Sequence, residues 1–314
     1  MRILVVGAGA LGGYFGGRLV AAGRDVTFLV RPPRAAQLRE AGLVIHSPHG
    51  DLTLRDVKTV TRDTLRESFD LIVLGCKAYD LDDAIASFAP AVGPDTMILP
   101  LLNGIGHLDV LRQRFGANAV LGGVCLIGAT LNDRREIVHL NDVHSIVFGE
   151  IGGGLSGRVN AAAGVLGGAG FDLKATPQIM QEMWEKWVFL ASLAGSTCLF
   201  RASIGEILAT PDGTALIERM FSECRAVAAE NGTPVRDAFV ERARAMLFAP
   251  GSPMTASMLR DVRNGSRTEA DHVLGDMIRR GGAAQHAAGE LTVLRIAYSQ
   301  LKAYEAQRAA AQQG

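Results

Sequence analysis

The sequence predicts an α/β protein in which a mainly parallel, doubly wound sheet domain is followed by an all-helical domain. Three observations support this fold class. Short apolar runs alternate with helical stretches in the first half of the chain, which is typical of parallel strands covered by helices on both faces. Strand patterns disappear after Thr176, and helical periodicity continues from Ile179. The length of 314 residues is sufficient for two domains.

The start of the chain predicts a strand, a tight turn and a helix. Residues 3–6 are a short apolar run that ends at Gly7, after which Leu11, Phe15 and Leu19 recur every fourth residue. Because continuous apolar runs suit strands that are buried on both faces, we expect further parallel strands at other runs of this kind. These runs are residues 26–30, 70–75 and 96–99.

Other segments predict antiparallel pairing at the edge of the first domain. Residues 43–54 turn at Pro48-His49-Gly50-Asp51 and predict a hairpin. Residues 119–150 predict shorter strands around the turn at Asn132-Asp133. The domain is therefore expected to be mixed at its edge.

A domain boundary is predicted near Thr176, just after a last short strand at residues 171–175. This places a sheet domain at residues 1–176 and a helical domain at residues 177–314. The alanine- and glutamine-rich tail after Tyr304 is expected to fray.

The charge and cysteine content exclude several classes of partner. Lys+Arg and Asp+Glu number 32 each, so no global field would attract a nucleic acid or an anionic membrane. The apolar stretches at residues 3–23 and 187–200 lack the flanking charges or the length of an export or membrane segment. The four scattered cysteines contain no CxxC pair, which suits a reducing, cytoplasmic location. The expected partner is a small molecule, and the apolar helical domain would also suit a homodimer.

The segment Gly7-Ala8-Gly9-Ala10-Leu11-Gly12 is a GxGxxG motif placed directly between the first predicted strand and helix. In this position the first glycine permits the turn, the second lets the backbone approach a pyrophosphate, and the third lets the helix pack on the strand. The helix start supplies N–H donors and the positive end of a dipole. The motif therefore predicts a Rossmann-type dinucleotide site. The alternative is a glycine-rich seam for helix packing, which Gly16 and Gly17 would extend.

The residue after the second strand predicts which dinucleotide binds. An NAD-binding unit usually has an acid about twenty residues beyond the glycine motif, where it bonds the ribose hydroxyls. This chain has Arg31 there, with Arg34 close behind, and a guanidinium fork favours the extra phosphate of NADP(H). The alternative is a solvated loop arginine, because arginine is frequent in this sequence.

Lysine is rare in this chain, which makes the position of each one informative. Lys186 lies in Trp184-Glu185-Lys186-Trp187, early in the first helix of the second domain. An ammonium group beside two large aromatic side chains could donate a proton in a reduction. The alternative is an i, i+4 ion pair with Glu182.

Taken in order, the motifs resemble those of the ketopantoate reductases, which are 2-dehydropantoate 2-reductases. The resemblance spans both predicted domains, and the order and spacing of the motifs make it specific. It implies NADPH-dependent reduction of a 2-oxo acid to a 2-hydroxy acid, by default 2-dehydropantoate to pantoate in pantothenate biosynthesis. The matching residues are Gly7-x-Gly9-x-x-Gly12, Arg31, Cys76-Lys77-Ala78, Asn103-Gly104-x-Gly106, Trp184-x-Lys186, Ser257-Met258-x-x-Asp261 and Arg267-Thr268-Glu269-Ala270-Asp271.

The resemblance implies a role for each matching side chain. Lys186 would be the general acid that protonates the ketone oxygen as hydride arrives, and Glu269 would hold the distal hydroxyl of the substrate and orient the lysine. Asn103 would contact both nicotinamide and substrate. Lys77 would line the cofactor site, and Ser257 would bond the substrate carboxylate.

Local patterns offer structural alternatives for three of these residues. Lys77 could be a solvated loop charge. Ser266-Arg267-Thr268-Glu269 matches a capping box, which would use the Glu269 side chain at a helix start. Ser257 could be an ordinary polar residue in a helix that follows the cap and first-turn pair Ser252-Pro253.

Two positions on the helix that carries Lys186 depart from the family. Typical members have substrate-contacting asparagines one and two turns after the lysine, where this chain has Leu190 and Ala194. Another asparagine, before the serine motif, is replaced by Met254. The substrate-binding residues are therefore expected to be more apolar, so another branched or bulkier 2-oxo acid would fit equally well.

Other functions have less support from the sequence. A 6-phosphogluconate-type dehydrogenase shares the two-domain plan, and a catalytically silent NADP-binding sensor would signal through domain closure. Retention of both Lys186 and Glu269 favours an enzyme over the sensor. The seven histidines are dispersed, and neither the His46/His49 pair nor the His139/His144 pair comes with the acids or cysteines of a metal site, so no metal is expected.

Overall fold

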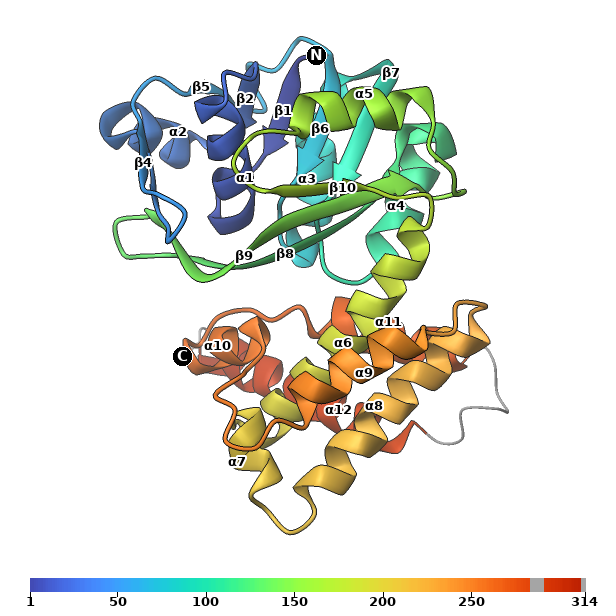
Figure 1. Ribbon diagram of the computed structural model, residues 1–314. Helices are drawn as coiled ribbons and strands as arrows, with labels where there is room; N and C mark the ends of the chain where they lie inside the picture. The colour runs from blue at the N-terminus through green and yellow to red at the C-terminus, as the bar shows by residue number, and fades with distance from the viewer. Residues whose placement is uncertain (283–290, 312–314) are drawn as a thin grey trace. The chain divides into compact units, whose positions relative to one another are not determined.

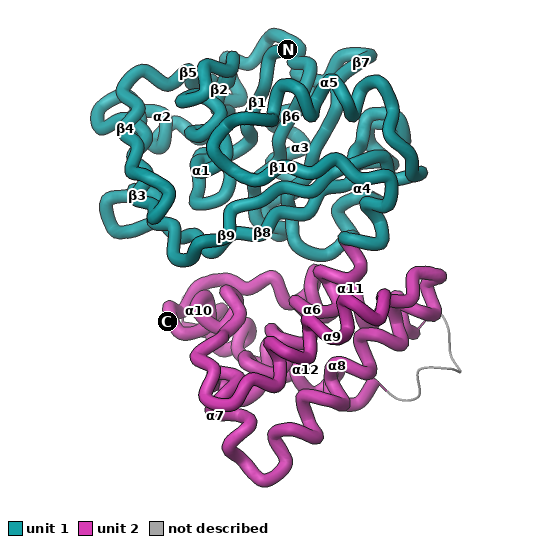
Figure 2. The backbone as a smooth tube through the Cα atoms, viewed as in Figure 1, with its two compact units in different colours: residues 1–182 teal, residues 183–314 magenta. Residues whose placement is uncertain are grey.

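The computed structural model describes residues 1–282 and 291–311. The chain divides into two compact units, residues 1–182 and 183–314, which are teal and magenta in Figure 2. Helix α6, Ile179–Phe200, begins in the first unit and continues into the second.

The first unit contains the predicted parallel sheet, in the order β5-β2-β1-β6-β7 (Figure 1). Every neighbouring pair in it is parallel. The central strand β1 is buried along its whole length, as its continuous apolar sequence predicts. The short edge strand β5 was not predicted, because its Lys-Thr-Val sequence has no apolar run. The strands are β1 Ile3–Val6, β2 Val26–Leu29, β5 Lys58–Val60, β6 Phe69–Leu74 and β7 Val92–Pro100.

The predicted antiparallel strands form a second sheet, which is mixed and separate from the parallel one. This sheet has the order β10-β9-β3-β4, and β8 pairs with β9. The β3/β4 hairpin is confirmed, whereas β8 and β9 are longer than expected. Strands that bury only alternate side chains, as β3 does, suit a layer with one covered face. The strands are β3 Leu43–His46, β4 Leu52–Leu54, β8 Leu121–Leu131, β9 Ile137–Glu150 and β10 Asp172–Ala175.

Helix α1, Ala10–Ala21, packs against strands of both sheets and joins their cores. A Cβ on Gly16 would lie 2.5 Å from the ring of Phe28, on the parallel sheet. A Cβ on Gly17 would lie 2.7 Å from Ile45, on the second sheet. The glycine-rich packing seam is therefore present as well as the turn motif. The other α-helices of this unit are α2 Pro32–Ala41, α3 Leu81–Phe88, α4 Gly106–Phe115 and α5 Gly157–Leu166.

The described residues of the second unit form helices and connecting turns, as predicted. Residues 305–311 of the tail do not fray as expected, because helix α12 continues to Ala311. The last part of the tail, residues 312–314, lies outside the described residues. After α6, the helices are α7 Ile204–Leu208, α8 Gly213–Glu230, α9 Asp237–Leu247, α10 Ser257–Arg263, the π-helical turn η4 Asp271–Gly275, α11 Asp276–Gly282 and α12 Thr292–Ala311.

A buried carboxylate connects two of the long helices. Glu223 on α8 accepts the backbone N–H groups of Thr292, Val293 and Leu294 at 3.1, 3.2 and 2.9 Å. A negative side chain at a helix N-terminus satisfies donors that have no partner within the helix and interacts favourably with its dipole. This contact fixes the start of α12 against α8.

Candidate active site

The carboxyl ends of four neighbouring parallel strands gather the residues predicted to bind a cofactor. In the order β2, β1, β6 and β7, the strands lead into Arg31, the turn Gly7–Gly12, Lys77 and Asn103. From β1 the chain proceeds to β2 and β5 on one side, and β6 and β7 lie on the other. Ligands of open α/β sheets bind outside the carboxyl edge at such a switch point.

The turn after β1 has the backbone geometry that a pyrophosphate site needs. Gly7 has a φ of +91°, a conformation that favours glycine, and a Cβ on Gly12 would lie 2.2 Å from the Gly7 carbonyl oxygen. A Cβ on Gly9, by contrast, would have nothing within 4 Å. Helix α1 begins at Ala10 with no capping side chain and no acidic residue in its first turn, which includes Leu11. Its N–H donors therefore suit an anion.

Arg34 on α2 supports this turn. Its side chain is buried, its Nε donates to the Ala8 carbonyl at 3.1 Å, and a terminal nitrogen donates to the Arg135 carbonyl at 3.0 Å. Burial lowers the pKa of Arg34 to about 10, and the nearby Arg135 adds to the effect. Although the sequence grouped Arg34 with Arg31 as a phosphate contact, its hydrogen bonds hold the glycine turn.

Arg31 is exposed and lies beside two carboxylates. Its side chain is 69% exposed, and one guanidinium nitrogen lies 3.0 Å from Asp83 and 3.4 Å from Asp80. The hydrogen bond to Asp83 is the largest of several effects that raise the pKa of Arg31. A guanidinium in this position can bind a phosphate, but it would have to exchange these carboxylates for it.

Lys77 and Asn103 are both partly buried near strand ends. Lys77 precedes the short turn Ala78–Asp80, and Asn103 precedes Gly104, whose φ is +72°. A Cβ on Gly75 would lie 2.9 Å from the Gly12 backbone. The strand end that leads to Lys77 is therefore in direct backbone contact with the glycine turn.

Lys186 lies on α6 between two well-anchored neighbours. The preceding residue, Glu185, is buried and forms a two-pronged ion pair with Arg236 at 2.7 and 2.6 Å. The following residue, Trp187, is buried and donates from Nε1 to the Val273 carbonyl at 2.9 Å. Glu182, the expected ion-pair partner of Lys186, lies 3.6 Å from the Lys174 ammonium. The sequence did not reveal the Glu185–Arg236 pair, because the partners are far apart in the chain.

Glu269 is buried immediately before the π-helical turn η4. Its backbone carbonyl accepts the N–H groups of His272 and Val273 at 3.1 and 2.9 Å. Because Trp187 also bonds Val273, α6 and η4 are linked close to both Lys186 and Glu269. Isolated π-helical turns are frequent at functional sites.

Helix α12 anchors the segment around Glu269 from another side. The hydroxyl of Thr268 donates to Glu305 at 2.6 Å, and the Asp271 carboxylate accepts from Tyr298 at 2.6 Å and Lys302 at 2.9 Å. The Thr268 hydroxyl also accepts the Ala270 N–H at 3.4 Å. The helix N-cap is Ala270, so the predicted capping box, which needs Ser266 at that position, is in the wrong register.

The predicted substrate-binding positions differ in exposure. Ser257 is exposed and is the first residue of α10, so this helix does not follow Ser252 directly as expected. The Ser252 hydroxyl instead accepts the Met254 N–H at 3.3 Å. On α6, Leu190 is partly buried and Ala194 is fully buried.

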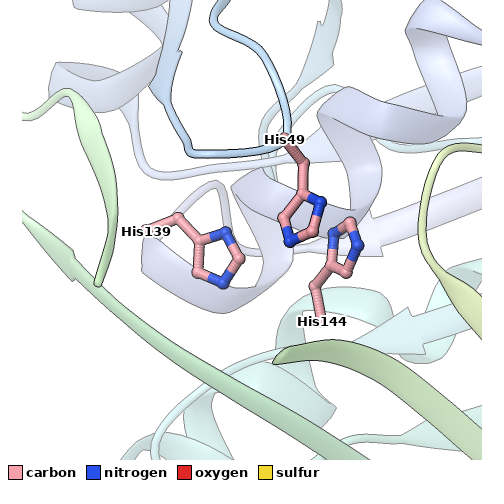
Figure 3. Close-up of side chains that lie close together, drawn as sticks. All are labelled: His49, His139 and His144. Atoms are coloured by element: carbon pink, nitrogen blue, oxygen red, sulfur yellow. The ribbon is translucent and has the colours of Figure 1, made fainter. Parts of the chain in front are cut away.

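Three histidines that the sequence did not group together lie close to one another in the first unit (Figure 3). They are His49, His139 and His144. Burial above all lowers the pKa of His144, and the nearby His49, His139 and Arg18 add to the effect. His46 lies apart from this cluster and pairs with Asp51 and Glu136.

Two further observations concern membrane-spanning helices and disulfide bonds. Within residues 1–282 and 291–311, the structure has no helix that combines the length and the apolar character needed to cross a membrane. All four cysteines are among the described residues, and none of them forms a disulfide.

Comparison with protein families gives matches over both units. Residues 3–153 match the family model of ketopantoate reductase PanE/ApbA. Residues 178–305 match the model of the ketopantoate reductase PanE/ApbA C terminal.

Individual relatives cover almost the whole chain. The chain is 37% identical to uncharacterized oxidoreductase YkpB of Bacillus subtilis (strain 168), over 98% of this chain and 100% of YkpB. It is 29% identical to the 2-dehydropantoate 2-reductase of Halobacterium salinarum, over 89% of this chain and 92% of that protein. The crystal structure of 2-dehydropantoate 2-reductase from Methylococcus capsulatus superimposes with a TM-score of 0.85 at 30% identity, covering 98% of each chain.

Proposed function

The chain belongs to the ketopantoate reductase family of oxidoreductases, and from this premise we propose that it reduces a 2-oxo acid to a 2-hydroxy acid with NADPH. The observation that carries the proposal is the convergence of the glycine turn, Arg31, Lys77 and Asn103 at one edge of the parallel sheet. The first substrate to test is 2-dehydropantoate, which is the substrate in the name of the Halobacterium salinarum relative. A role in pantothenate biosynthesis would follow from that substrate.

The cofactor would be held mainly by backbone groups of residues 1–176, which we propose as the cofactor-binding domain. The open space at Gly9 and the uncapped start of α1 fit a pyrophosphate. Arg31 would bind the 2′-phosphate that distinguishes NADPH from NADH. Lys77 and Asn103 would line the nicotinamide end. When bound, NADPH supplies the hydride.

The proton would come from residues 177–314, which we propose as the catalytic domain. As the carbonyl carbon gains hydride, negative charge grows on the ketone oxygen, and the Lys186 ammonium would stabilise that charge and donate its proton. Glu269 would accept a hydrogen bond from the substrate hydroxyl and orient Lys186. Ser257 is exposed and could bond the substrate carboxylate. Lys186 would regain a proton from water after product release.

We propose that the substrate is larger or more apolar than 2-dehydropantoate. Leu190 lies one helical turn beyond Lys186, where typical family members have an asparagine, and its side chain has no hydrogen-bonding group. Ala194 is fully buried, so an asparagine there would bury a larger amide group in a packed core. Leu190→Asn is therefore the variant that tests substrate preference without burying an amide group in the packed core. A homodimer is part of the proposal and is checked by light scattering of the purified chain.

The decisive experiment is an NADPH-oxidation screen over 2-oxo acids that differ in branching and size. We expect turnover with at least one of them, and Leu190→Asn should shift the preference toward hydroxylated substrates. If NADPH binds tightly and no 2-oxo acid is reduced, the chain is a cofactor-binding sensor and not a reductase. If NADPH does not bind, the cofactor assignment is wrong.

Glu269→Gln tests whether this side chain serves the reaction or the fold. Glutamine keeps the size and one oxygen of the glutamate side chain, and the backbone bonds to His272 and Val273 stay in place, so the melting temperature should change little. We expect kcat to fall by about tenfold or more, because a misoriented general acid loses much of its contribution. A lower melting temperature with unchanged kcat would show that Glu269 is structural.

A further inference from the structure

Three histidine side chains in the first unit are close enough to share one metal ion, and the proposed reaction does not use them. One possible ligand atom from each of His49, His139 and His144 lies within 4.8 Å of the other two. Figure 3 shows the three rings gathered at one place. His139 and His144 are buried, whereas His49 is exposed, so an ion could enter from the side of His49.

A bulge in β9 brings His139 and His144 to the same side of the strand. Residues five apart on a regular strand point to opposite faces. In the antiparallel pair, His139 lies opposite Ala129 and His144 lies opposite Ile127. Five residues of β9 therefore span the same distance as two residues of β8. The three extra residues include Asn141, whose side chain accepts the Gly128 N–H at 2.8 Å. Bulges of this kind re-aim side chains and are often found beside functional sites.

The turn between β3 and β4 supplies the third histidine and is fixed at several points. Arg18 on α1 donates to the Gly50 carbonyl at 2.7 Å. The Ser47 hydroxyl accepts the backbone N–H of His49 at 3.2 Å. The Nε2 atom of His49 lies 2.7 Å from the Asp142 carbonyl, within the β9 bulge. Turn and bulge therefore hold the three rings together.

In His49 and His144, a hydrogen bond at one ring nitrogen leaves the other ring nitrogen for a metal. Nδ1 of His144 lies 2.7 Å from the Tyr14 hydroxyl, and Nδ1 of His139 lies 3.0 Å from the Ser47 hydroxyl. Metal-binding histidines typically have such a partner on the non-coordinating nitrogen, which fixes the ring and its tautomer. Nε2 of His139 also lies 3.1 Å from the Val143 carbonyl, and a metal would replace that bond.

The donor set selects a class of metal. Three imidazole nitrogens suit Zn²⁺, Ni²⁺ or Cu²⁺, whereas Mg²⁺ and Ca²⁺ prefer oxygen ligands. We propose that His49, His139 and His144 bind one transition-metal ion of this class, with water in the remaining coordination position.

Two features of the cluster limit its affinity. The rings of His49 and His144 stack with centroids 3.8 Å apart and planes 17° apart, so they must rotate to point their nitrogens at one ion. The Arg18 guanidinium lies over the Tyr14 ring, 5.2 Å from its centroid, and its charge opposes a cation nearby. A reversible site is therefore expected, and not a permanently occupied structural one.

The test measures Zn²⁺ binding by calorimetry on the full chain after treatment with a chelator. We expect one Zn²⁺ per chain in the wild type and a rise in melting temperature on binding. His49→Ala should weaken binding at least tenfold and abolish the rise. His49 is exposed in a turn, so this variant should fold, which circular dichroism checks. Co²⁺ provides a second probe, because a four-coordinate site gives intense visible absorption that His49→Ala should lose.

His46→Gln is the matched control, because it removes a neighbouring histidine that lies outside the cluster. We expect it to bind Zn²⁺ like the wild type. Equal affinity in the wild type and His49→Ala, or equal weakening by His46→Gln, would contradict the site. Absence of stoichiometric Zn²⁺ binding to the folded wild type would also contradict it, and the cluster would then be a stack of hydrogen-bonded rings only.

Discussion

Two regions of the molecule are held in place in different ways. One is the carboxyl edge of the parallel sheet, which we propose as the cofactor edge, and the other is the segment around Lys186 and Glu269 in the second unit. At the cofactor edge, the backbone and the strand order place the key groups, with glycines permitting close contact. Around Lys186 and Glu269, side-chain hydrogen bonds from Trp187, Thr268 and Asp271 hold the elements together. A backbone site can be located from a short motif, whereas a side-chain site depends on partners that are distant in sequence.

The largest effect is expected from Lys186→Ala. Loss of a general acid typically lowers the rate by about 10²- to 10⁴-fold, so kcat should fall within that range. The dissociation constant for NADPH should not change, because the proposed cofactor contacts lie on the parallel sheet. Steady-state kinetics and a fluorescence titration with NADPH measure the two quantities.

Lys174→Ala is the control for that experiment, because it removes an exposed lysine whose ion pair is with Glu182. Its kcat should equal that of the wild type. A Lys186→Ala variant that retains kcat would show that the proton comes from another group. The proposed role of the second unit in supplying the proton would then be wrong.

Two glycine variants at the proposed cofactor edge separate an effect on NADPH binding from an effect on stability. Gly9→Val adds a side chain where the structure is open, so the fold should persist while NADPH affinity falls by about tenfold or more, which is about 1.4 kcal/mol. Gly12→Ala places a Cβ 2.2 Å from a backbone oxygen, so stability itself should fall. Thermal unfolding and NADPH titration distinguish the outcomes. Equal melting temperatures for the two variants would be inconsistent with this distinction.

These differences explain how much could be predicted from the sequence. Continuous apolar runs and the GxGxxG motif were sufficient for β1, α1 and the parallel sheet, because both patterns are local. The separation of the antiparallel strands into a second sheet was not predicted, because alternating strands indicate one buried face without saying which layer covers it. Lys186 was singled out by the scarcity of lysine, and the family resemblance supplied its role and that of Glu269. Their supports, such as Glu185 with Arg236, join residues about fifty positions apart and leave no local pattern.

A smaller effect is expected from Asp83→Asn, which removes one carboxylate from Arg31. Arg31 would then be more available to a 2′-phosphate. Exposed ion pairs contribute about 1 kcal/mol or less, so NADPH should bind about two- to fivefold more tightly. NADH affinity should stay the same, and a parallel titration with NADH is the control. Equal gains for both cofactors would indicate that Arg31 does not recognise the phosphate.

The last predicted effect is on stability and concerns a side-chain pair in the first unit. Glu150 accepts from Arg158 at 2.7 and 2.5 Å, and this hydrogen bonding lowers the pKa of Glu150 below its usual value near 4.5. Glu150→Gln should reduce the free energy of unfolding by about 1 kcal/mol at neutral pH.

The pH dependence of this effect follows from the direction of the pKa shift. A carboxyl group with a lowered pKa stabilises the folded state above its unfolded pKa, and this contribution disappears as pH falls through the folded value. The difference between the wild type and Glu150→Gln should therefore shrink below about pH 4.5. Urea unfolding at several pH values measures it. A difference that stays constant with pH would show that the charge is not involved.

The contact between Gly75 and Gly12 has a consequence for engineering this protein. Because a Cβ on Gly75 would lie 2.9 Å from the Gly12 backbone, the turn has no room for larger residues at either position. Substitutions of Gly12 or Gly75 that aim to change cofactor preference should therefore destabilise the fold. Arg31, Asp80 and Asp83 have exposed side chains. If Arg31 binds the 2′-phosphate as proposed, substitutions there should alter cofactor preference and leave the fold intact.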